Sequence, residues 1–342
     1  MTKPTRTKET EAAYLRRFAQ LKSRVEKSLS RKCTVMEFAT ALVERIRPQL
    51  SPQSWRQYRA AACYGLELKR VAFPDSKDPV DTAVLLLRNT PPAGRPPDRT
   101  LRTSQKKAKK VPIDDLTAIQ RHVLAGQSPR RQNLADYLAA ADLTGLRPCE
   151  WRRSQLRPST TPGLQWELIV ACAKRTNGRA HGNERTLRYQ KLEAELVVTL
   201  MRWIAVAREA ELNGRYGKLM KALGSLMRNC CAEVFRRRKQ RPTLYTPRHQ
   251  AAARWKAFFV RTDDTPEKQE HGRAIVATLL GHATDVTATH HYARPDSDER
   301  GSRGLAIPVA DPSEVARIRR KYAVKLEMKA ARELLPASGR RT

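Results

Sequence analysis

Four short segments of the sequence carry side chains that could act together on a phosphate group. Arg147 and Arg248 each stand beside a proline at an apparent helix start, His282 follows a Leu-Gly pair, and Tyr292 lies in polar, basic surroundings. A guanidinium presents a planar fork of donors that matches phosphate oxygens. A tyrosine hydroxyl can act as a nucleophile, and a histidine can donate a hydrogen bond. These residue types suit chemistry at a phosphate, but no single segment is specific for it.

The first segment reads Thr144-Gly145-Leu146-Arg147-Pro148-Cys149-Glu150. Pro148 disfavours helical geometry at Arg147 and suits the first position of a following helix. We therefore expect Arg147 at a turn, with a side chain that is free to project. Taken alone, an arginine at a helix start is more often a surface residue than a catalytic one.

The chain is strongly basic for its 342 residues. Its 67 Lys and Arg against 34 Asp and Glu leave a formal net charge of +33. Hydrophobic residues make up 40%, too much for a disordered polycation, so packed domains with a basic surface are expected. Nucleic acid is the partner that suits such a surface. A membrane surface fits less well, because aromatic residues are only 6% and no basic segment has an aromatic-rich apolar face.

Targeting, metal and cofactor signals are not found in the sequence. There is no secretory signal, transit peptide or run of about 18 apolar residues, so we expect a cytoplasmic, nucleoid-associated protein. The six cysteines form no C-x-x-C pair, and the histidines show no metal-ligand spacing. We expect neither a metal nor a cofactor, and the lack of a phosphate-binding G-x-x-x-x-G-K-[ST] loop fits a reaction without ATP.

The front of the chain is predicted to be a helical domain over residues 8–88. Thr34 and Glu37 form a capping box, and Ser51-Pro52 is a typical start of another helix. Residues 89–112 contain five prolines and a run of lysines. This composition predicts an extended basic linker.

Residues 113–300 are predicted to be mainly helical, with a small sheet near the beginning. Residues 164–173 are rich in β-favouring side chains, 184–189 can supply the next strand, and Asn177-Gly178 is a turn pair between them. Residues beyond Leu192 follow a helical pattern. The fold class is therefore mainly α with a small antiparallel β-sheet.

The end of the chain carries two further helix signals. Gly281 stands where a helix from Pro266 would need a left-handed cap. In residues 301–342, a loop precedes a helix that should run from Pro312 to about Leu335.

In their order, the four segments resemble the tyrosine recombinase, or phage integrase, family. Its catalytic domain shows G-L-R-x-x-E, then H-x-x-R-H, then L-G-H, then a tyrosine. Here 101 residues separate Arg147 from Arg248, and 44 separate Arg248 from Tyr292. The segment 50–58 also looks like a motif of the family's core-binding domain. The resemblance spans residues 8–300 and implies a DNA-binding, α-helical core-binding domain joined to a catalytic domain of the DNA breaking-rejoining fold.

The resemblance implies a role for each residue of the four segments. Tyr292 would attack a DNA phosphodiester and form a 3′-phosphotyrosyl link that conserves the bond energy. Arg147 and Arg248 would stabilise charge on the phosphate. His282 would hydrogen-bond the phosphate or the nucleophile's oxygen, and Glu150 would support the site from a second layer of contacts.

The family also uses a lysine on a β-hairpin as general acid and a second, structural histidine. Lys174, just before the predicted turn, is the candidate for the general acid, although it could instead only contact a backbone phosphate. Lys191 fits the strand-turn geometry less well. His249 matches the structural histidine.

Two departures from the family pattern stand out. Tyr245 occupies the place that usually holds a histidine, and a phenol with a pKa of about 10 is a poor general base at neutral pH. Tyr245 can still hydrogen-bond the phosphate or position Tyr292. In addition, ten residues rather than the common nine separate His282 from Tyr292. A slower or differently tuned site is expected, not an inactive one.

The resemblance implies a site-specific recombinase that acts on double-stranded DNA through a Holliday junction, and the frequency of such roles in the family favours a mobile element. Homotetramers on synapsed sites, with or without an accessory protein, would follow from the resemblance, and the C-terminal helix could dock on a neighbouring protomer, pack in cis or contact DNA. Two alternatives remain open. One is DNA relaxation of the type IB topoisomerase kind, and the other is a non-catalytic DNA-binding accessory protein.

Overall fold

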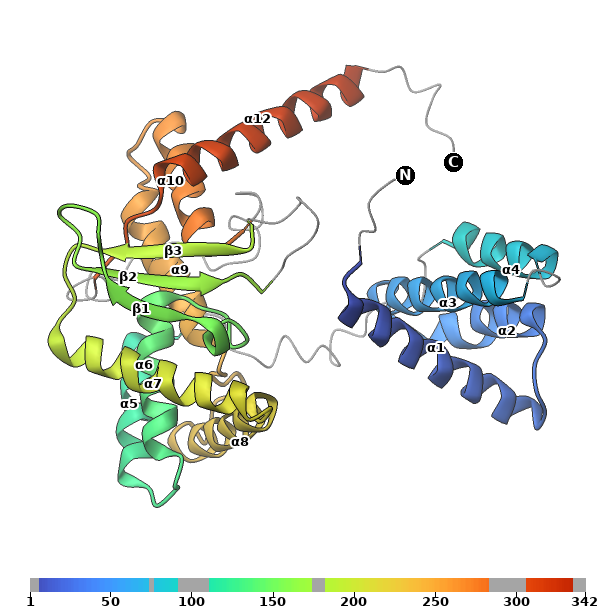
Figure 1. Ribbon diagram of the computed structural model, residues 1–342, viewed down its shortest axis with the longest axis horizontal. Helices are drawn as coiled ribbons and strands as arrows, with labels where there is room; N and C mark the ends of the chain where they lie inside the picture. The colour runs from blue at the N-terminus through green and yellow to red at the C-terminus, as the bar shows by residue number, and fades with distance from the viewer. Residues whose placement is uncertain (1–5, 74–76, 92–110, 174–181, 283–305, 335–342) are drawn as a thin grey trace. The chain divides into compact units, whose positions relative to one another are not determined.

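The computed structural model describes residues 6–73, 77–91, 111–173, 182–282 and 306–334. The chain divides into two compact units, Met1–Thr103 and Ser104–Thr342. Its described elements are mostly helices with one small antiparallel sheet, so the predicted fold class is confirmed (Figure 1).

The first unit is helical throughout its described part. Its helices are α1 (Lys8–Leu29), α2 (Val35–Ala41), α3 (Pro52–Ala72) and α4 (Lys77–Asn89), with a π-helical turn (Leu42–Ile46) and a 3₁₀ turn (Arg47–Gln49) between α2 and α3.

The predicted helix starts of this unit are confirmed. The Thr34 side chain accepts from the Glu37 backbone while the Glu37 carboxylate accepts from the Thr34 backbone, and the Ser51 side chain caps α3. Helix α1 packs on α3, and α4 packs on α2 and α3. Trp55 is fully buried and Leu66 nearly so, which places the core of this unit on the inner face of α3.

The second unit combines one small sheet with several helices. Its elements are α5 (Ile113–Ala125), α6 (Arg131–Thr144), a 3₁₀ turn (Trp151–Arg153), β1 (Gln155–Pro158), β2 (Trp166–Ala171), β3 (Glu184–Tyr189), α7 (Ala194–Leu212), α8 (Tyr216–Val234), α9 (Thr246–Phe259), α10 (Pro266–Leu279) and α12 (Pro312–Leu334).

The sheet has the order β1-β2-β3 with antiparallel neighbours. Leu168 pairs with Leu156 on one side and Leu187 on the other, so one apolar row crosses the sheet. The strands β2 and β3 match the predicted ones, whereas β1 was not predicted. Its sequence is short and ends at Pro158, which an edge strand tolerates but which gives no strand signal.

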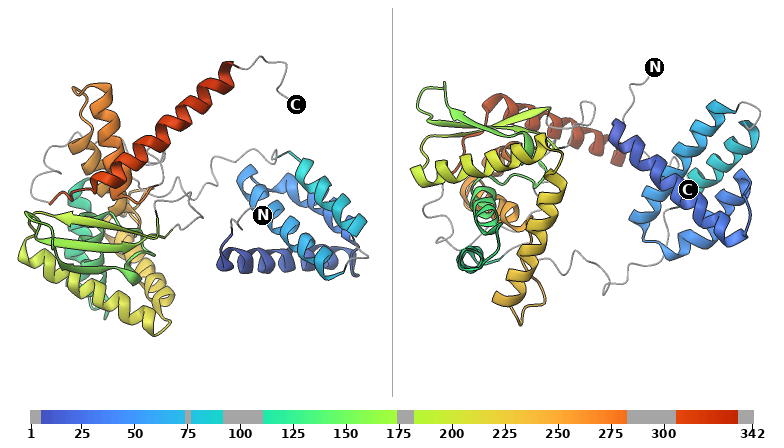
Figure 2. Two further views of the ribbon diagram at one scale, coloured as in Figure 1. Left: turned by 45° about the horizontal axis from the view of Figure 1, so that its top comes forward. Right: turned by 60° about the horizontal axis from the view of Figure 1, so that its bottom comes forward.

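Buried aromatic rings connect the helices and the sheet of the second unit. Trp203 of α7 makes edge-to-face contacts with Tyr137 of α6 and with Trp151 of the 3₁₀ turn. Trp255 of α9 is also fully buried. These tryptophans are core residues. Helix α7 runs along the sheet in both views of Figure 2.

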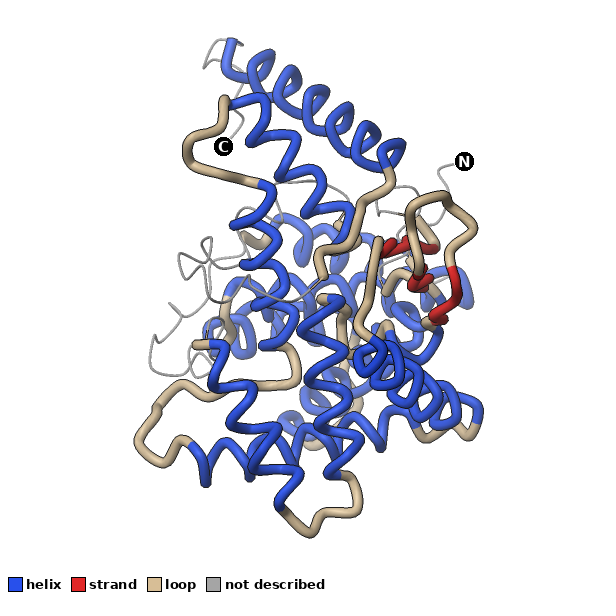
Figure 3. The backbone as a smooth tube through the Cα atoms, turned by 90° about the vertical axis from the view of Figure 1, so that its left-hand side faces the viewer, coloured by secondary structure: helices blue, strands red, loops and turns tan. Residues whose placement is uncertain are grey.

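The predicted C-terminal helix is confirmed as α12. Its first turns pack in cis against α10, where Val315 and Ile318 are buried. The tube view in Figure 3 shows this helix pair at one end of the unit. None of the helices in the described ranges combines the length and apolar character that crossing a membrane requires.

Candidate functional site

A buried carboxylate, that of Glu150, gathers arginines from three parts of the second unit. Glu150 is 1% exposed. Arg147 Nη1 donates to its Oε1 at 2.6 Å, and Arg185 donates from Nη1 to Oε1 at 3.1 Å and from Nη2 to Oε2 at 2.9 Å. Arg248 Nη1 lies 3.8 Å from Oε2. Three guanidinium groups therefore share one carboxylate, and the cluster keeps an excess of positive charge.

The turn that carries Arg147 is held from two directions. The Arg147 backbone N–H donates to Glu150 Oε2 at 2.7 Å, and the Tyr216 hydroxyl of α8 donates to the carbonyl of Pro148. Arg147 does lie at a turn, but only the 3₁₀ turn Trp151–Arg153 follows it. The expectation of a freely projecting side chain is wrong, because Glu150 fixes the guanidinium and only 10% of the side chain is exposed.

Arg248 joins the first and third predicted segments. It lies in the first turn of α9, beside Pro247 as predicted, and its side chain is fully buried. Its Nη1 donates to the carbonyl of Gly145, and its Nη2 donates to the carbonyl of Leu280 at 2.7 Å. Gly145 has a φ of +60°, and a Cβ there would lie 2.9 Å from the Trp255 ring. A glycine is thus required where the two segments meet.

His282 completes this contact. The predicted left-handed residue before it is confirmed, since Gly281 has a φ of +63° at the end of α10. The ring Nε2 of His282 lies 3.3 Å from Arg248 Nη2. An arginine can only donate, so Nε2 must be the acceptor, and the neutral ring then carries its proton on Nδ1.

Tyr245 and His249 lie at the same end of α9. Tyr245 is the N-cap residue of the helix, and its ring centroid lies 5.4 Å from that of His249 with the rings inclined at 60°. The residue before it is anchored as well, because the buried Tyr137 hydroxyl donates to the carbonyl of Leu244. Tyr245, which stands where the family usually has a histidine, is therefore held at the start of the same helix as Arg248. The roles of Tyr245 and His249 stay predictions.

The arginines keep Glu150 ionised. Burial alone would raise the pKa of this carboxyl, but Arg185, Arg248 and Arg147 outweigh burial and hold the pKa well below its usual range. Pairing with Glu150 likewise outweighs desolvation and raises the pKa of Arg147 and Arg185. Glu150, Arg147 and Arg185 are therefore charged near neutral pH.

Lys174 and Tyr292 lie outside the described residues. Ala173, the last described residue before Lys174, contacts the cluster, since its backbone N–H donates to Glu150 Oε1 at 3.4 Å. The assignments of Lys174 as general acid and of Tyr292 as nucleophile stay predictions.

Arg185 is the member of the cluster that sequence reasoning missed. A signal was available in the alternation of β3, because Arg185, Leu187 and Tyr189 share the buried face of the strand. An arginine on the inward face of a strand needs a buried partner.

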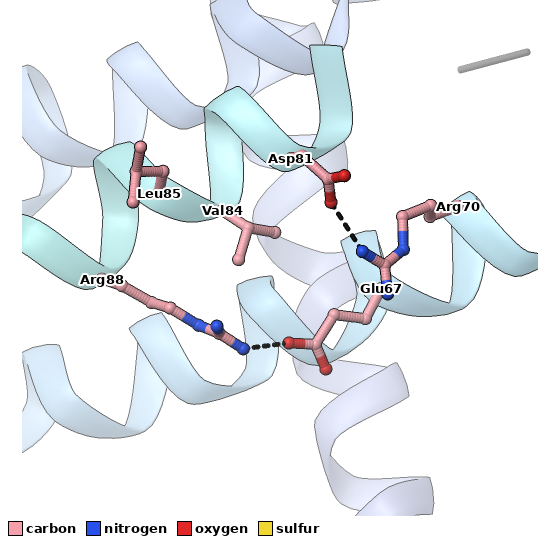
Figure 4. A pocket seen from close by; sticks show the side chains of 6 residues that line it. All are labelled: Glu67, Arg70, Asp81, Val84, Leu85 and Arg88. Carbon is pink, nitrogen blue, oxygen red and sulfur yellow. Dashed lines mark hydrogen bonds and ion pairs between the residues drawn. The ribbon is translucent and has the colours of Figure 1, made fainter. Parts of the chain in front are cut away.

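The rest of the described chain shows no metal-binding cluster, and the charges around one of its cavities are already paired. No group of three or more His, Cys, Asp or Glu side chains there could hold a metal ion. A cavity of about 180 Å³ between α3 and α4 is lined by charges that already pair with one another, Arg70 with Asp81 and Arg88 with Glu67 (Figure 4).

Comparison with known proteins finds structures but no sequence relatives. No family model and no curated protein matches the chain. The XerH site-specific recombinase bound to palindromic difH substrate, in a post-cleavage complex, is 14% identical with a TM-score of 0.47, over 85% of this chain and 77% of that one. Its pre-cleavage complex with difH substrate is 14% identical with a TM-score of 0.46, over 82% and 75%.

A protelomerase TelA variant covalently complexed with substrate DNA is 12% identical, with a TM-score of 0.44 over 95% of this chain and 94% of that one.

Proposed function

We propose that the chain is a DNA strand transferase of the tyrosine recombinase type, which cuts and rejoins duplex DNA at a specific site. The buried contact among Arg147, Glu150, Arg248 and His282 carries this proposal. These residues come from three separate segments, and their excess positive charge lies in a chain whose net charge is +33. A preorganised cationic site of this kind stabilises charge that develops on a phosphate.

Each arginine contributes differently to that stabilisation. Arg147 has the only partly exposed side chain of the three on Glu150, so its outer edge would contact the scissile phosphate. Arg248 would act from behind, through its charge and by holding the carbonyls of Gly145 and Leu280 in place. Glu150 fixes the direction of Arg147.

The covalent step would use residues outside the described ranges. The Tyr292 oxygen attacks phosphorus and releases its proton to solvent, the bond to the 5′ oxygen breaks, and the Lys174 ammonium gives that oxygen a proton. The reverse reaction with a new 5′ hydroxyl rejoins the strand, so neither ATP nor a cofactor is needed. Tyr245 would hydrogen-bond the phosphate or position Tyr292, while His249 supports it.

The reaction scheme extends to the assembly on DNA. Synapsed sites would hold a homotetramer, with or without an accessory protein, and strands would be exchanged through a Holliday junction for a mobile element. Because the first turns of α12 are engaged in cis on α10, only the later part of that helix would be left to reach a neighbouring protomer.

The test begins by selecting the preferred site from a pool of random duplexes with the full chain. A duplex with this site and a nick beside the scissile phosphate should then trap a denaturant-resistant protein–DNA adduct. The adduct should be lost in Tyr292→Phe and persist in Tyr322→Phe, the matched tyrosine further along the chain.

Three results would contradict parts of the proposal. An adduct that persists in Tyr292→Phe removes the assigned nucleophile. Site-specific binding without any adduct favours the non-catalytic alternative. Relaxation of an arbitrary supercoiled plasmid favours the topoisomerase alternative.

A further inference from the structure

Arg185 is a buried cation that the proposed reaction does not use. Its side chain is 2% exposed, and each of its three nitrogens has a protein acceptor. Nη1 and Nη2 donate to the two oxygens of Glu150, and Nε donates to the carbonyl of Leu279 at 3.0 Å. Burying an arginine is costly unless it is paired in this complete way.

The structure makes room for this side chain at Gly281. A Cβ at Gly281 would lie 2.7 Å from Arg185 Nη1 and 3.0 Å from its Cζ. The glycine before His282 therefore has two reasons to be a glycine, its positive φ and the approach of Arg185. The contact places the guanidinium directly against the end of α10.

Three parts of the proposed site meet at Arg185. Through Glu150 it reaches Arg147, which shares Oε1 with it. The same oxygen accepts from Ala173, the residue before Lys174. The Nε of Arg185 donates to the last residue of α10, and the chain continues from there to His282. The Arg185 guanidinium thus connects three segments. It contacts the end of α10 directly, and through Glu150 it is linked to the turn of Arg147 and to the residues after β2.

We propose that Arg185 is a positioning residue for strand transfer, which orients Arg147 and Ala173 through Glu150 and holds the end of α10 at His282. This inference rests on the proposed function. Arg185 does not touch the phosphate in this scheme. It acts by keeping the contacting groups in a geometry whose loss by about 1 Å can cost about 100-fold in rate.

The test compares Arg185→Met and Arg185→Lys with a matched control, Arg254→Met. Arg254 is also a buried arginine, 3% exposed, but it pairs with Asp142. All variants are assayed below their melting temperatures on the nicked duplex described above. Two quantities are measured, the dissociation constant for DNA and the rate of adduct formation at saturating DNA.

Arg185→Met should form adduct about 10- to 100-fold more slowly while its DNA affinity changes less than about twofold. Arg185→Lys should recover part of the rate, because it keeps the charge but not the fork. Arg254→Met should keep the wild-type rate even where its melting temperature falls. Equal rates for Arg185→Met and Arg254→Met, or a loss confined to DNA affinity, would overturn the proposal.

A second measurement needs no DNA, so it separates failure of this inference from failure of the proposed function. The Glu150 carboxyl carbon is titrated by NMR and assigned with Glu150→Gln. The charged groups that face this carboxyl are Arg147, Arg185 and Arg248, with the Cys172 thiol and the His282 ring beside them. Removing Arg185 should raise the pKa of Glu150, whereas removing Arg254 should not.

An unchanged Glu150 titration in both Arg185 variants would show that Arg185 does not control this carboxylate, whatever the DNA assays give. A raised pKa together with a wild-type protein that forms no adduct would keep the Arg185–Glu150 coupling, but it would remove the reaction that the coupling was proposed to serve.

Discussion

The arginine–carboxylate pairs between α3 and α4 and those at Glu150 lie in opposite surroundings. Between α3 and α4, Arg70 Nη1 lies 2.7 Å from Asp81 and Arg88 Nη2 lies 2.6 Å from Glu67, with the arginine side chains 43% and 63% exposed (Figure 4). In the second unit, the pair of Arg185 with Glu150 has side-chain exposures of 2% and 0%. The chemical groups are the same, and only their contact with water differs.

The difference shows which charges are candidates for a function. When an exposed pair forms, the two charged groups replace contacts with water by a contact with each other. Such a pair therefore contributes only about 0–1 kcal/mol to stability. Burying an ion costs several kcal/mol unless its hydrogen bonds are complete. Glu150 accepts from five donors of Arg147, Ala173 and Arg185. An arrangement this demanding, with cations in excess, is typical of a site that acts on an anion.

The largest effect is expected from Glu150→Gln. This change leaves three buried guanidinium groups without their counter-charge, which should lower the free energy of unfolding by about 3–5 kcal/mol. Urea denaturation followed by circular dichroism measures it. A loss below about 1 kcal/mol would mean that the buried cluster stabilises the protein no more than an exposed pair does.

Acid should remove the same stabilisation gradually. The pKa of Glu150 is depressed in the folded state, so its contribution is complete above the unfolded pKa of about 4.3 and is lost as the pH falls through the folded value. The difference in unfolding free energy between wild type and Glu150→Gln should stay constant from about pH 6 to about pH 5 and shrink in more acid solution. A difference that shrank already near neutral pH would contradict the depressed pKa.

Gly281→Ala should be more harmful than Gly214→Ala. Both glycines have a φ of +63°, so both substitutions carry the conformational cost of about 1–2 kcal/mol. A Cβ at Gly214 meets nothing within 4 Å, whereas one at Gly281 collides with Arg185. Thermal unfolding should show an additional loss of about 1–3 kcal/mol for Gly281→Ala. Equal losses would mean that Arg185 can move aside freely.

The smallest effect is expected from Glu67→Gln, the matched substitution at an exposed pair. Its loss should be about 0–1 kcal/mol and should fade as salt is raised, because water and ions screen Arg88. Urea denaturation at low and high salt measures both features. A loss comparable to that of Glu150→Gln would remove the contrast between the two regions.

Much of the fold followed from local signals. The capping box at Thr34 and the strand 184–189 are where the sequence predicts them, because caps and alternation act over a few residues. The edge strand β1 was not predicted. Its pairing with β2 stabilises an extended conformation that the residues Gln155–Pro158 do not favour alone. The prediction that the Arg147 side chain projects freely was also wrong, because its burial depends on the packing around Glu150.

The sequence by itself determined the basic character, the helical starts and the order of the motif residues Arg147, Arg248 and His282. Tertiary structure decided which cations are buried and what they bind. Arg185 reaches Leu279 across 94 positions, and Arg248 reaches Gly145 across 103. Such contacts depend on how α9, α10 and β3 pack together, and no local propensity encodes this. Packing therefore separates the few arginines that surround Glu150 from the many that remain in water.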